Sequence, residues 1–510
     1  MVRIMRLYPL GKCSEKLIRG SPEQSSESLL EMSSLIVKNL AKCIVMPANS
    51  GTIERMSIRR QIRPMLTLAI PLVAAELGWM TMGIVDTMMV GHMDSAALAL
   101  SAVALGQVLY STVAFGIAGV LLGLDTYLSQ SHGAGHYDEA NRWLYHGLIL
   151  AAGLATLLYS IVAVAPFLLL RLPINHGVLV GAVSFLRALN WGTPSLFLYF
   201  ALRRYLQAFN HVRPIAVALI SANLFNALGD WLLIYGHTWG AVHIPAFGVT
   251  GSGLATSIAR LYLALFLVAV VWRVEHKHNY GLRSMLRHIE TSRLRRLASL
   301  GAPAGGQIFV EIAIFGTVTF LIGTMGPLPL SGHEIALNCA SFTFMVPFAI
   351  SSAAAVRVGQ AIGRKALAEA SAAGWAAILL GAGCMAFFSA ILLLFHHAIA
   401  HAFTENDAVI AATVPLLLVA AAFQFFDGLQ ITATGALRGV GNTHTGLIVQ
   451  IVGYWLIGLP VGYFLAFRLH YGALGLWLGL CAGLIVAGLT LTLSWRHTIR
   501  SMTKTMLESA

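Results

Sequence analysis

The chain has 510 residues, of which 57% are hydrophobic and only 11% are charged. Soluble domains carry about 25% charged residues, so this composition excludes an ordinary soluble protein and indicates a protein built for lipid. The formal net charge of +12 does not indicate a nucleic-acid partner, because Lys and Arg lie mostly between apolar stretches and form no basic stripe interleaved with aromatic residues.

Residues 1–60 are polar and differ from the rest of the chain. A Ser/Glu cluster runs from Ser21 to Ser28, and no charged segment leads into an apolar one. We therefore expect a disordered N-terminal extension without a cleavable signal.

Apolar stretches long enough to cross a bilayer, which takes about 20 helical residues, recur from Leu66 onward. We predict an all-α polytopic membrane protein with twelve transmembrane helices. The stretches cover residues 66–91, 97–124, 143–170, 178–202, 214–236, 249–272, 299–326, 334–356, 371–395, 409–437, 446–467 and 473–495.

The chain repeats itself at its midpoint. LAIP at 68–71 returns as LGAP at 300–303, and YLSQSHGAG at 127–135 returns as RVGQAIGRK at 357–365. The repeats predict two pseudo-symmetric six-helix lobes, a transporter architecture. The predicted parts are the N-lobe 61–272, a basic cytoplasmic linker 273–297, the C-lobe 298–496 and a cytoplasmic tail 497–510.

The connections between helices differ strongly in charge. Every second connection, counted from that between the second and third stretch, is basic, and together these hold fifteen Lys and Arg. The alternate connections hold only Arg171 and Arg468. Positively charged connections stay in the cytoplasm, so we predict a multi-pass protein of the plasma (inner) membrane with both termini cytoplasmic.

Four acidic residues lie inside the predicted spans: Asp86, Asp230, Glu311 and Asp427. A charged side chain at the bilayer centre costs at least ~2.5–3.5 kcal/mol, so such a residue normally faces a cavity or a partner. The alternative is structural, with each acid protonated and hydrogen-bonded between helices. Acids in both lobes with polar companions favour the functional interpretation.

Polar residues at helical spacing accompany these acids. Glu76 and Met82 are weaker candidates on the first helix. The residues that could line a shared cavity are Glu76, Met82, Asn223, Gln307 and Gln424, and Asn226 stands one turn before Asp230. Oxygen-rich clusters of this kind suit Na⁺ or a proton, and the spacing does not choose between them.

No motif for bound cofactors or catalysis accompanies the clusters. Glycine patterns lack the Lys-Ser/Thr of a phosphate-binding loop, the five cysteines form no C-x-x-C pair, and H-E-x-x-H and G-x-S-x-G are absent. We therefore expect no enzyme activity and no cofactor. The coupling ion would be Na⁺ or H⁺, and we expect no metal other than a possible Na⁺.

Several segments together resemble the multidrug and toxic-compound extrusion (MATE) family, particularly its bacterial NorM-like branch, over about residues 60–500. They are MGIVDTMMVGHMD, FNALGDWLLIYG, GAPAGGQIFVEIAIF, HEIALNCASFTFMVPFAISSAAAVRVGQAIG, FTEN and FQFFDGLQITATGALRGVGNT. Phe423 departs from the family's tyrosine, and Asp230 stands where relatives often have Asn.

The resemblance implies two sites. Asp86, Asn226, Asp230 and Thr256 match the cation or proton site of the N-lobe, and Glu311 and Asp427 match the acidic pair of the C-lobe. It also implies a MATE-type pair of lobes that exports amphipathic, often cationic compounds in exchange for Na⁺ or H⁺, and we expect it to act as a monomer. Two alternatives remain open: a lipid-linked oligosaccharide flippase of the wider superfamily, and a membrane-embedded enzyme.

Overall fold

The computed structural model describes residues 51–93, 96–169, 171, 175–239, 242–282 and 288–509. Of the N-terminal extension 1–60 that we expect to be disordered, residues 1–50 lie outside the described residues. Residues 51–60 are helical: α4 begins at Gly51 and includes the polar residues that precede the first apolar stretch.

The first half of the chain forms six crossings and one short hairpin. Its helical elements are α4 (Gly51–Gly91), α5 (Ala96–Ala118), the 3-10 turn η1 (Gly119–Leu122), α6 (Gly123–Gly133), α7 (Tyr137–Leu169), α8 (His176–Asn190), α9 (Thr193–Ala208), α10 (Arg213–Tyr235) and α11 (Val249–His278). Strands β1 (His237–Trp239) and β2 (Val242–Ile244) pair antiparallel between α10 and α11.

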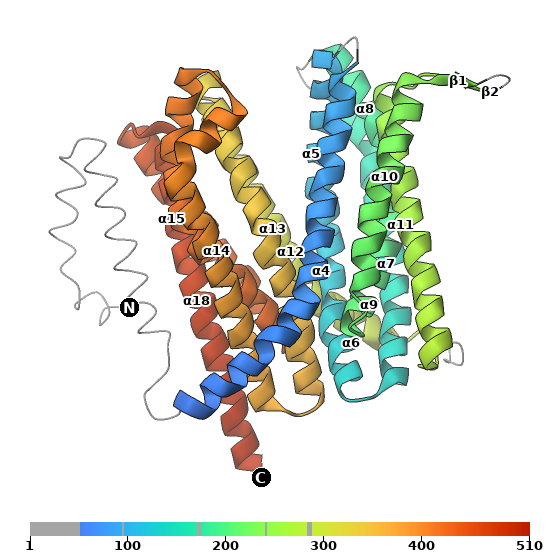
Figure 1. Ribbon diagram of the computed structural model, residues 1–510, viewed down its shortest axis with the longest axis vertical. Coiled ribbons are helices and arrows are strands. Elements are labelled where there is room, and N and C mark those ends of the chain that lie inside the picture. Colours follow the sequence, from blue (N-terminus) through green and yellow to red (C-terminus); the bar gives the residue numbers. More distant parts are fainter. Residues whose placement is uncertain are drawn as a thin grey trace. The chain divides into compact units, whose positions relative to one another are not determined.

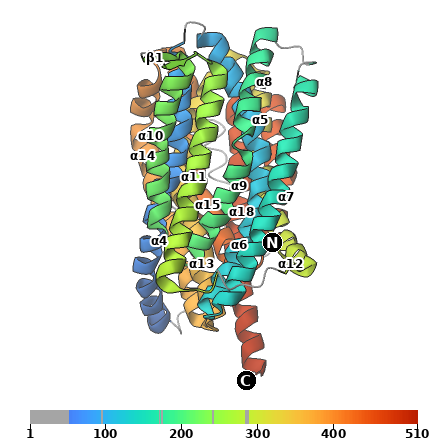
Figure 2. The ribbon, with the colours of Figure 1, turned by 90° about the vertical axis from the view of Figure 1, so that its right-hand side faces the viewer.

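The second half forms six more crossings. Its elements are α12 (Thr291–Gly323), α13 (Pro327–Gly363), α14 (Leu367–Phe403), α15 (Asp407–Gly439), α16 (His444–Gln450), the π-helical segments η2 (Ile451–Gly458) and η3 (Phe464–Arg468) on either side of α17 (Leu459–Tyr463), and α18 (Gly472–Ser509). Figure 2 shows the long helices nearly parallel, with α18 extending beyond the others.

Eleven helices of the described residues are long and apolar enough to span a membrane. The one predicted span that is not among these eleven is the fourth in chain order, 178–202. It is broken into α8 and α9, each too short to span a membrane alone. The break falls at Trp191–Gly192, where the Gly192 amide donates to Ser257 Oγ of α11 at 3.1 Å and Pro194 opens the next helix. The predicted twelve crossings therefore include one bent pair.

The helices gather into two bundles, one from each half of the chain (Figure 1). The bundles meet at one end, where two related glycines remove the side chains that would separate them. Gly133 of α6 lies against the backbone of Gln360, and Gly363 of α13 lies against the backbone of Gln130. These pairs occupy matching places in the repeat seen in the sequence, so the contact has the pseudo-symmetry of the duplication.

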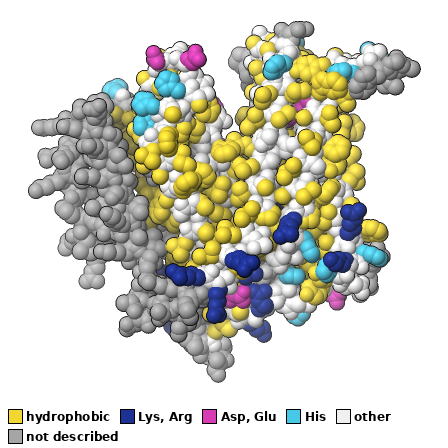
Figure 3. Space-filling model, viewed as in Figure 1, with side chains coloured by type: hydrophobic (Ala, Val, Ile, Leu, Met, Phe, Trp, Pro, Cys, Tyr) yellow, Lys and Arg dark blue, Asp and Glu magenta, His cyan; other side chains and the backbone are white. Residues whose placement is uncertain are grey.

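Charge and hollowing distinguish the two ends of the molecule (Figure 3). On this face the Lys and Arg side chains gather toward the end where the bundles meet, and apolar side chains cover most of the middle. The surface is hollowed between the bundles at the opposite end. We refer to these as the basic end and the open end.

Candidate functional site

The first acidic site lies inside the first bundle and is built from α4, α10 and α11. Asn226 donates from Nδ2 to Asp86 Oδ1 at 2.8 Å and to Asp230 Oδ2 at 2.9 Å. The Thr256 hydroxyl lies 3.1 Å from Asp86 Oδ2 and donates to it. The structure thus brings together the four residues that the sequence grouped, and one amide joins two carboxylates.

This site has unused oxygen atoms. Asp230 is fully buried, and its Oδ1, like Asn226 Oδ1, has no hydrogen-bond partner. Buried oxygens without a donor are costly, which makes the site receptive to a proton or a small cation that would satisfy them.

The second acidic site lies between α12, α15 and the α16–η2 segment. Gln430 donates from Nε2 to Glu311 Oε1 at 3.1 Å and to Asp427 Oδ1 at 3.3 Å. Gln450 donates to Glu311 Oε2 at 3.3 Å, and the Tyr454 hydroxyl donates to Glu311 Oε1 at 3.5 Å. Again one side-chain amide joins two carboxylates.

The two sites are not copies of each other under the duplication. Glu311 follows Pro303 by eight residues, whereas Asp86 follows the equivalent Pro71 by fifteen. Seven residues of helix correspond to about 10 Å along its axis. The sites therefore lie at different depths and can carry different tasks.

Three of the predicted cavity-lining residues are packed inside the bundles in this structure. Gln424 is fully buried and exchanges hydrogen bonds of 2.9 and 3.1 Å with Thr343 between α13 and α15. Met82 is buried, and Glu76 forms a buried ion pair with Arg203. Glu76 and Gln424 thus have partners inside the bundles, and a cavity-lining role for these three residues stays a prediction.

Asn223 and Gln307, the two other predicted companions of the acids, form hydrogen bonds with groups other than the carboxylates. Asn223 donates to the Gly78 carbonyl of α4 at 2.9 Å and forms no hydrogen bond with Asp230 on its own helix. Gln307 lies one turn before Glu311 but donates to Thr434 Oγ1 of α15 at 3.4 Å. Both residues tie helices together beside the sites.

Sequence reasoning missed several members of the sites. Gln430, Gln450 and Tyr454 are all fully buried around Glu311. Arg260, one turn after Thr256, is also buried, and its guanidinium donates to the Tyr110 hydroxyl at 2.8 Å. An Arg within an apolar span is a functional signal of the same kind as the acids and could have been found that way.

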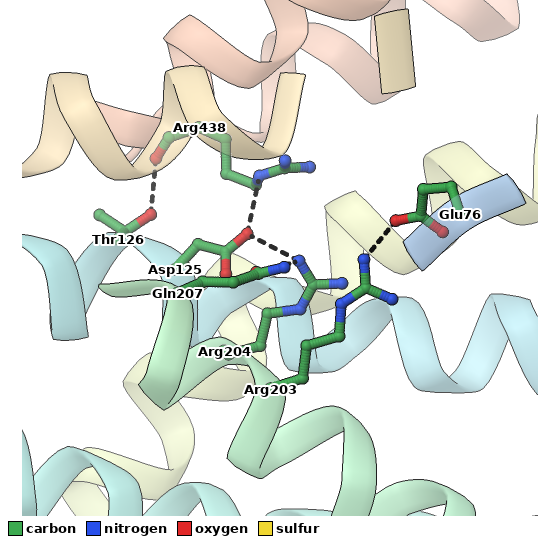
Figure 4. A network of polar contacts seen from close by, with 7 residues as sticks. All are labelled: Glu76, Asp125, Thr126, Arg203, Arg204, Gln207 and Arg438. Carbon is green, nitrogen blue, oxygen red and sulfur yellow. Dashed lines mark hydrogen bonds and ion pairs between the residues drawn. The ribbon is translucent and has the colours of Figure 1, made fainter. Parts of the chain in front are cut away.

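A buried ion network lies where the bundles meet (Figure 4). Asp125 Oδ2 of α6 lies 3.5 Å from Arg204 Nη1 of α9 and 3.4 Å from Arg438 Nε of α15. The Thr126 hydroxyl donates to the Arg438 carbonyl at 2.6 Å. Arg438 belongs to the second half, so these contacts join the two bundles.

The fifteen basic residues that the sequence places in connections between helices include Arg203, Arg204 and Arg438. In the structure Arg203 and Arg204 lie within α9, Arg438 lies in the last turn of α15, and all three are buried. Burying an ion without its partner costs several kcal/mol, so these side chains stay inside only because carboxylates meet them.

Comparison with known proteins identifies the family. The MatE family model matches residues 71–232 and again residues 303–464, so the same unit occurs in both halves. The chain belongs to the MatE family. It is a multi-pass membrane protein, and the two matches confirm the internal duplication.

Similar MatE proteins cover most of this chain. It is 33% identical over 452 residues to a protein of Xanthomonas axonopodis pv. citri named "Probable multidrug resistance protein NorM", covering 88% of this chain and 96% of the relative. A Pseudomonas aeruginosa protein with the same name is 33% identical over 461 residues, covering 88% of this chain and 92% of the relative.

Solved structures share the MATE fold. The eukaryotic MATE transporter AtDTX14 has a TM-score of 0.77 at 21% identity, over 87% of this chain and 98% of that chain. An outward-facing MATE family multidrug resistance transporter has a TM-score of 0.76 at 19% identity, over 86% and 96%. The predicted fold class is confirmed, and membership in a family of transporters sets the enzyme alternative aside.

Proposed function

We propose that this protein is a multidrug efflux antiporter that exports amphipathic, often cationic organic compounds in exchange for inward movement of Na⁺ or H⁺. The observation that carries the proposal is the pair of acidic sites, each with two carboxylates joined by one amide inside an apolar bundle. Similarity to proteins named for multidrug resistance supports the substrate class.

Coupling follows from competition at these carboxylates. Two neighbouring carboxylates in a medium of low dielectric do not both ionise cheaply unless a cation or proton joins them. A cationic substrate and the coupling ion both neutralise this charge, so binding of one lowers the affinity for the other. Ion binding from the open end would therefore release the substrate there.

Alternating access requires the basic end to open and the open end to close. Opening the basic end would separate Arg438 from Asp125 and Gly363 from Gln130. The transition therefore needs a ligand or ion that binds the two states with different affinity.

The simplest cellular test is dye accumulation. Expression of the chain in bacteria that lack their own efflux pumps should lower ethidium accumulation several-fold, and collapsing the ion gradients should restore it. A double variant, Asp86→Asn with Glu311→Gln, serves as the inactive control. Equal accumulation with wild type, double variant and empty vector would contradict the proposed function.

We also propose that the basic end faces the cytoplasm, as the gathering of Lys and Arg side chains at this end predicts. In a chain with its five cysteines replaced, His136→Cys at the basic end should resist an impermeant thiol reagent in intact cells. Glu405→Cys, after α14 at the other end, should react. The reverse labelling pattern would invert the orientation.

The functional unit is proposed to be a monomer, because one chain supplies both bundles and both acidic sites. Light scattering of the detergent-purified protein, corrected for bound detergent, should give the mass of one chain, 54.7 kDa. A stable mass of twice that value would contradict it.

A further inference from the structure

A cavity of about 610 Å³ lies at the basic end and is lined by segments of both halves. Pro64, Thr67 and Leu68 of α4 form one wall. The segment Asn210–Pro214, which leads into α10, and Arg357 of α13 form the rest. Neither acidic site contributes a residue to this cavity.

The lining is positively charged. Its charge comes from Arg213 and Arg357, and it contains no carboxylate. The nearby acid Glu369 lies 3.5 Å from Arg357 Nη2 but also 3.0 Å from Arg364 Nη2, so one carboxylate is shared by two guanidinium groups. Arg357 Nε is buried without a hydrogen-bond partner. The cavity therefore has unneutralised positive charge.

The same charge excludes a cationic substrate as the occupant, because like charges repel strongly at a partly buried site. An anion is favoured, and the remaining lining selects among anions. Pro64, Leu68, Val212 and Pro214 supply an apolar wall beside the arginines. A free phosphate would leave this wall exposed to water, whereas a molecule with a hydrocarbon part would cover it.

The position of the cavity also favours a molecule with a charged headgroup and a hydrocarbon part. Asn210 of the lining accepts a hydrogen bond of 3.1 Å from Gln360, at the contact between the bundles, so the cavity lies at the basic end, where Lys and Arg side chains gather (Figure 3). Basic pockets between membrane helices at the cytoplasmic surface bind the headgroups of anionic lipids. We propose that this cavity binds the headgroup of an anionic phospholipid, whose phosphate contacts Arg213 and Arg357.

The lipid would contact both halves, since α4 and Arg213 belong to the first half and Arg357 to the second. A ligand that binds only one arrangement of the halves stabilises that arrangement. Anionic lipid should therefore favour the state in which the basic end is shut. Headgroup binding itself does not depend on whether the chain transports drugs, so it can be tested separately.

Native mass spectrometry of the full chain in detergent tests the proposal. Phosphatidylglycerol should be retained about tenfold better than phosphatidylcholine with the same acyl chains, and Arg213→Gln with Arg357→Gln should abolish this preference. The matched control is Arg171→Gln with Arg468→Gln, two exposed arginines away from the cavity, which should keep it.

Each other outcome overturns the proposal. Equal retention of the two lipids would show that the cavity does not select an anionic headgroup. Competition by inorganic phosphate at equal concentration would identify a free-anion site instead. An unchanged preference in the cavity variant would place the lipid elsewhere. Should loss of the Gln61 and Glu369 contacts unfold the double variant, exposed Arg213→Gln alone should still weaken the preference measurably.

Discussion

Asp86→Asn and Asp230→Asn are each expected to reduce export to the level of cells without the protein, while the variants accumulate in the membrane as well as wild type. Asparagine keeps the shape of each side chain but cannot take up a proton or neutralise a cation. A hydrogen bond or contact to a charged group is worth about 1.5–3 kcal/mol, so ion affinity at this site should fall roughly 10- to 100-fold.

Stability should change little in these variants, because removing a buried charge also removes its desolvation cost. Asn226 has one amide hydrogen on each carboxylate, and an asparagine oxygen can accept either one. The matched control is Asp407→Asn at the exposed start of α15. Export like wild type would make the site structural, and failure of both variants to accumulate would show that it holds the helices together.

Glu311→Gln is expected to flatten the response of export to the driving ion gradient, yet leave the equilibrium affinity for a cationic dye within about tenfold, or ~1.4 kcal/mol. Glu311 accepts hydrogen bonds from Gln430, Gln450 and Tyr454 and shares Gln430 with Asp427. Losing its charge removes the reason for an ion to join the pair, so the ion no longer competes with substrate.

Dye affinity in detergent, measured beside gradient-driven export in proteoliposomes, separates these two effects. The exposed Glu405→Gln is the control and should behave as wild type in both assays. Loss of dye binding with an intact gradient response would mean that the second acidic site contacts the drug, and the assignment of ion coupling to Glu311 and Asp427 would be reversed.

The sequence was sufficient for the twelve crossings and the acidic residues, because lipid imposes long apolar stretches and makes every buried charge conspicuous. It did not predict the break between α8 and α9. The sequence is apolar on both sides of Trp191–Gly192, so its hydropathy shows no interruption at the bend. The bend depends on the contact of Gly192 with Ser257 of α11, which the structure alone reveals.

The sequence also could not predict which charged residues form ion pairs. Glu76 looked like a free acid available to a cavity, and Arg203 looked like a charge in a connection. They lie 127 positions apart along the chain, and only the packing of α4 against α9 makes them an ion pair. Arg438 and Asp125 likewise meet only because the bundles touch. Spacing along one helix predicts neighbours on that helix, but it cannot identify partners on another.

Substrate counterflow in proteoliposomes, with Na⁺ and pH gradients imposed separately, tests ion-coupled export most directly. An inward gradient of one of these ions should drive dye movement against its concentration difference, and the Asp86→Asn, Asp230→Asn and Glu311→Gln variants should lose this drive. Dye movement that follows only its own gradient, unchanged by either ion and equal in wild type and variants, would contradict the account.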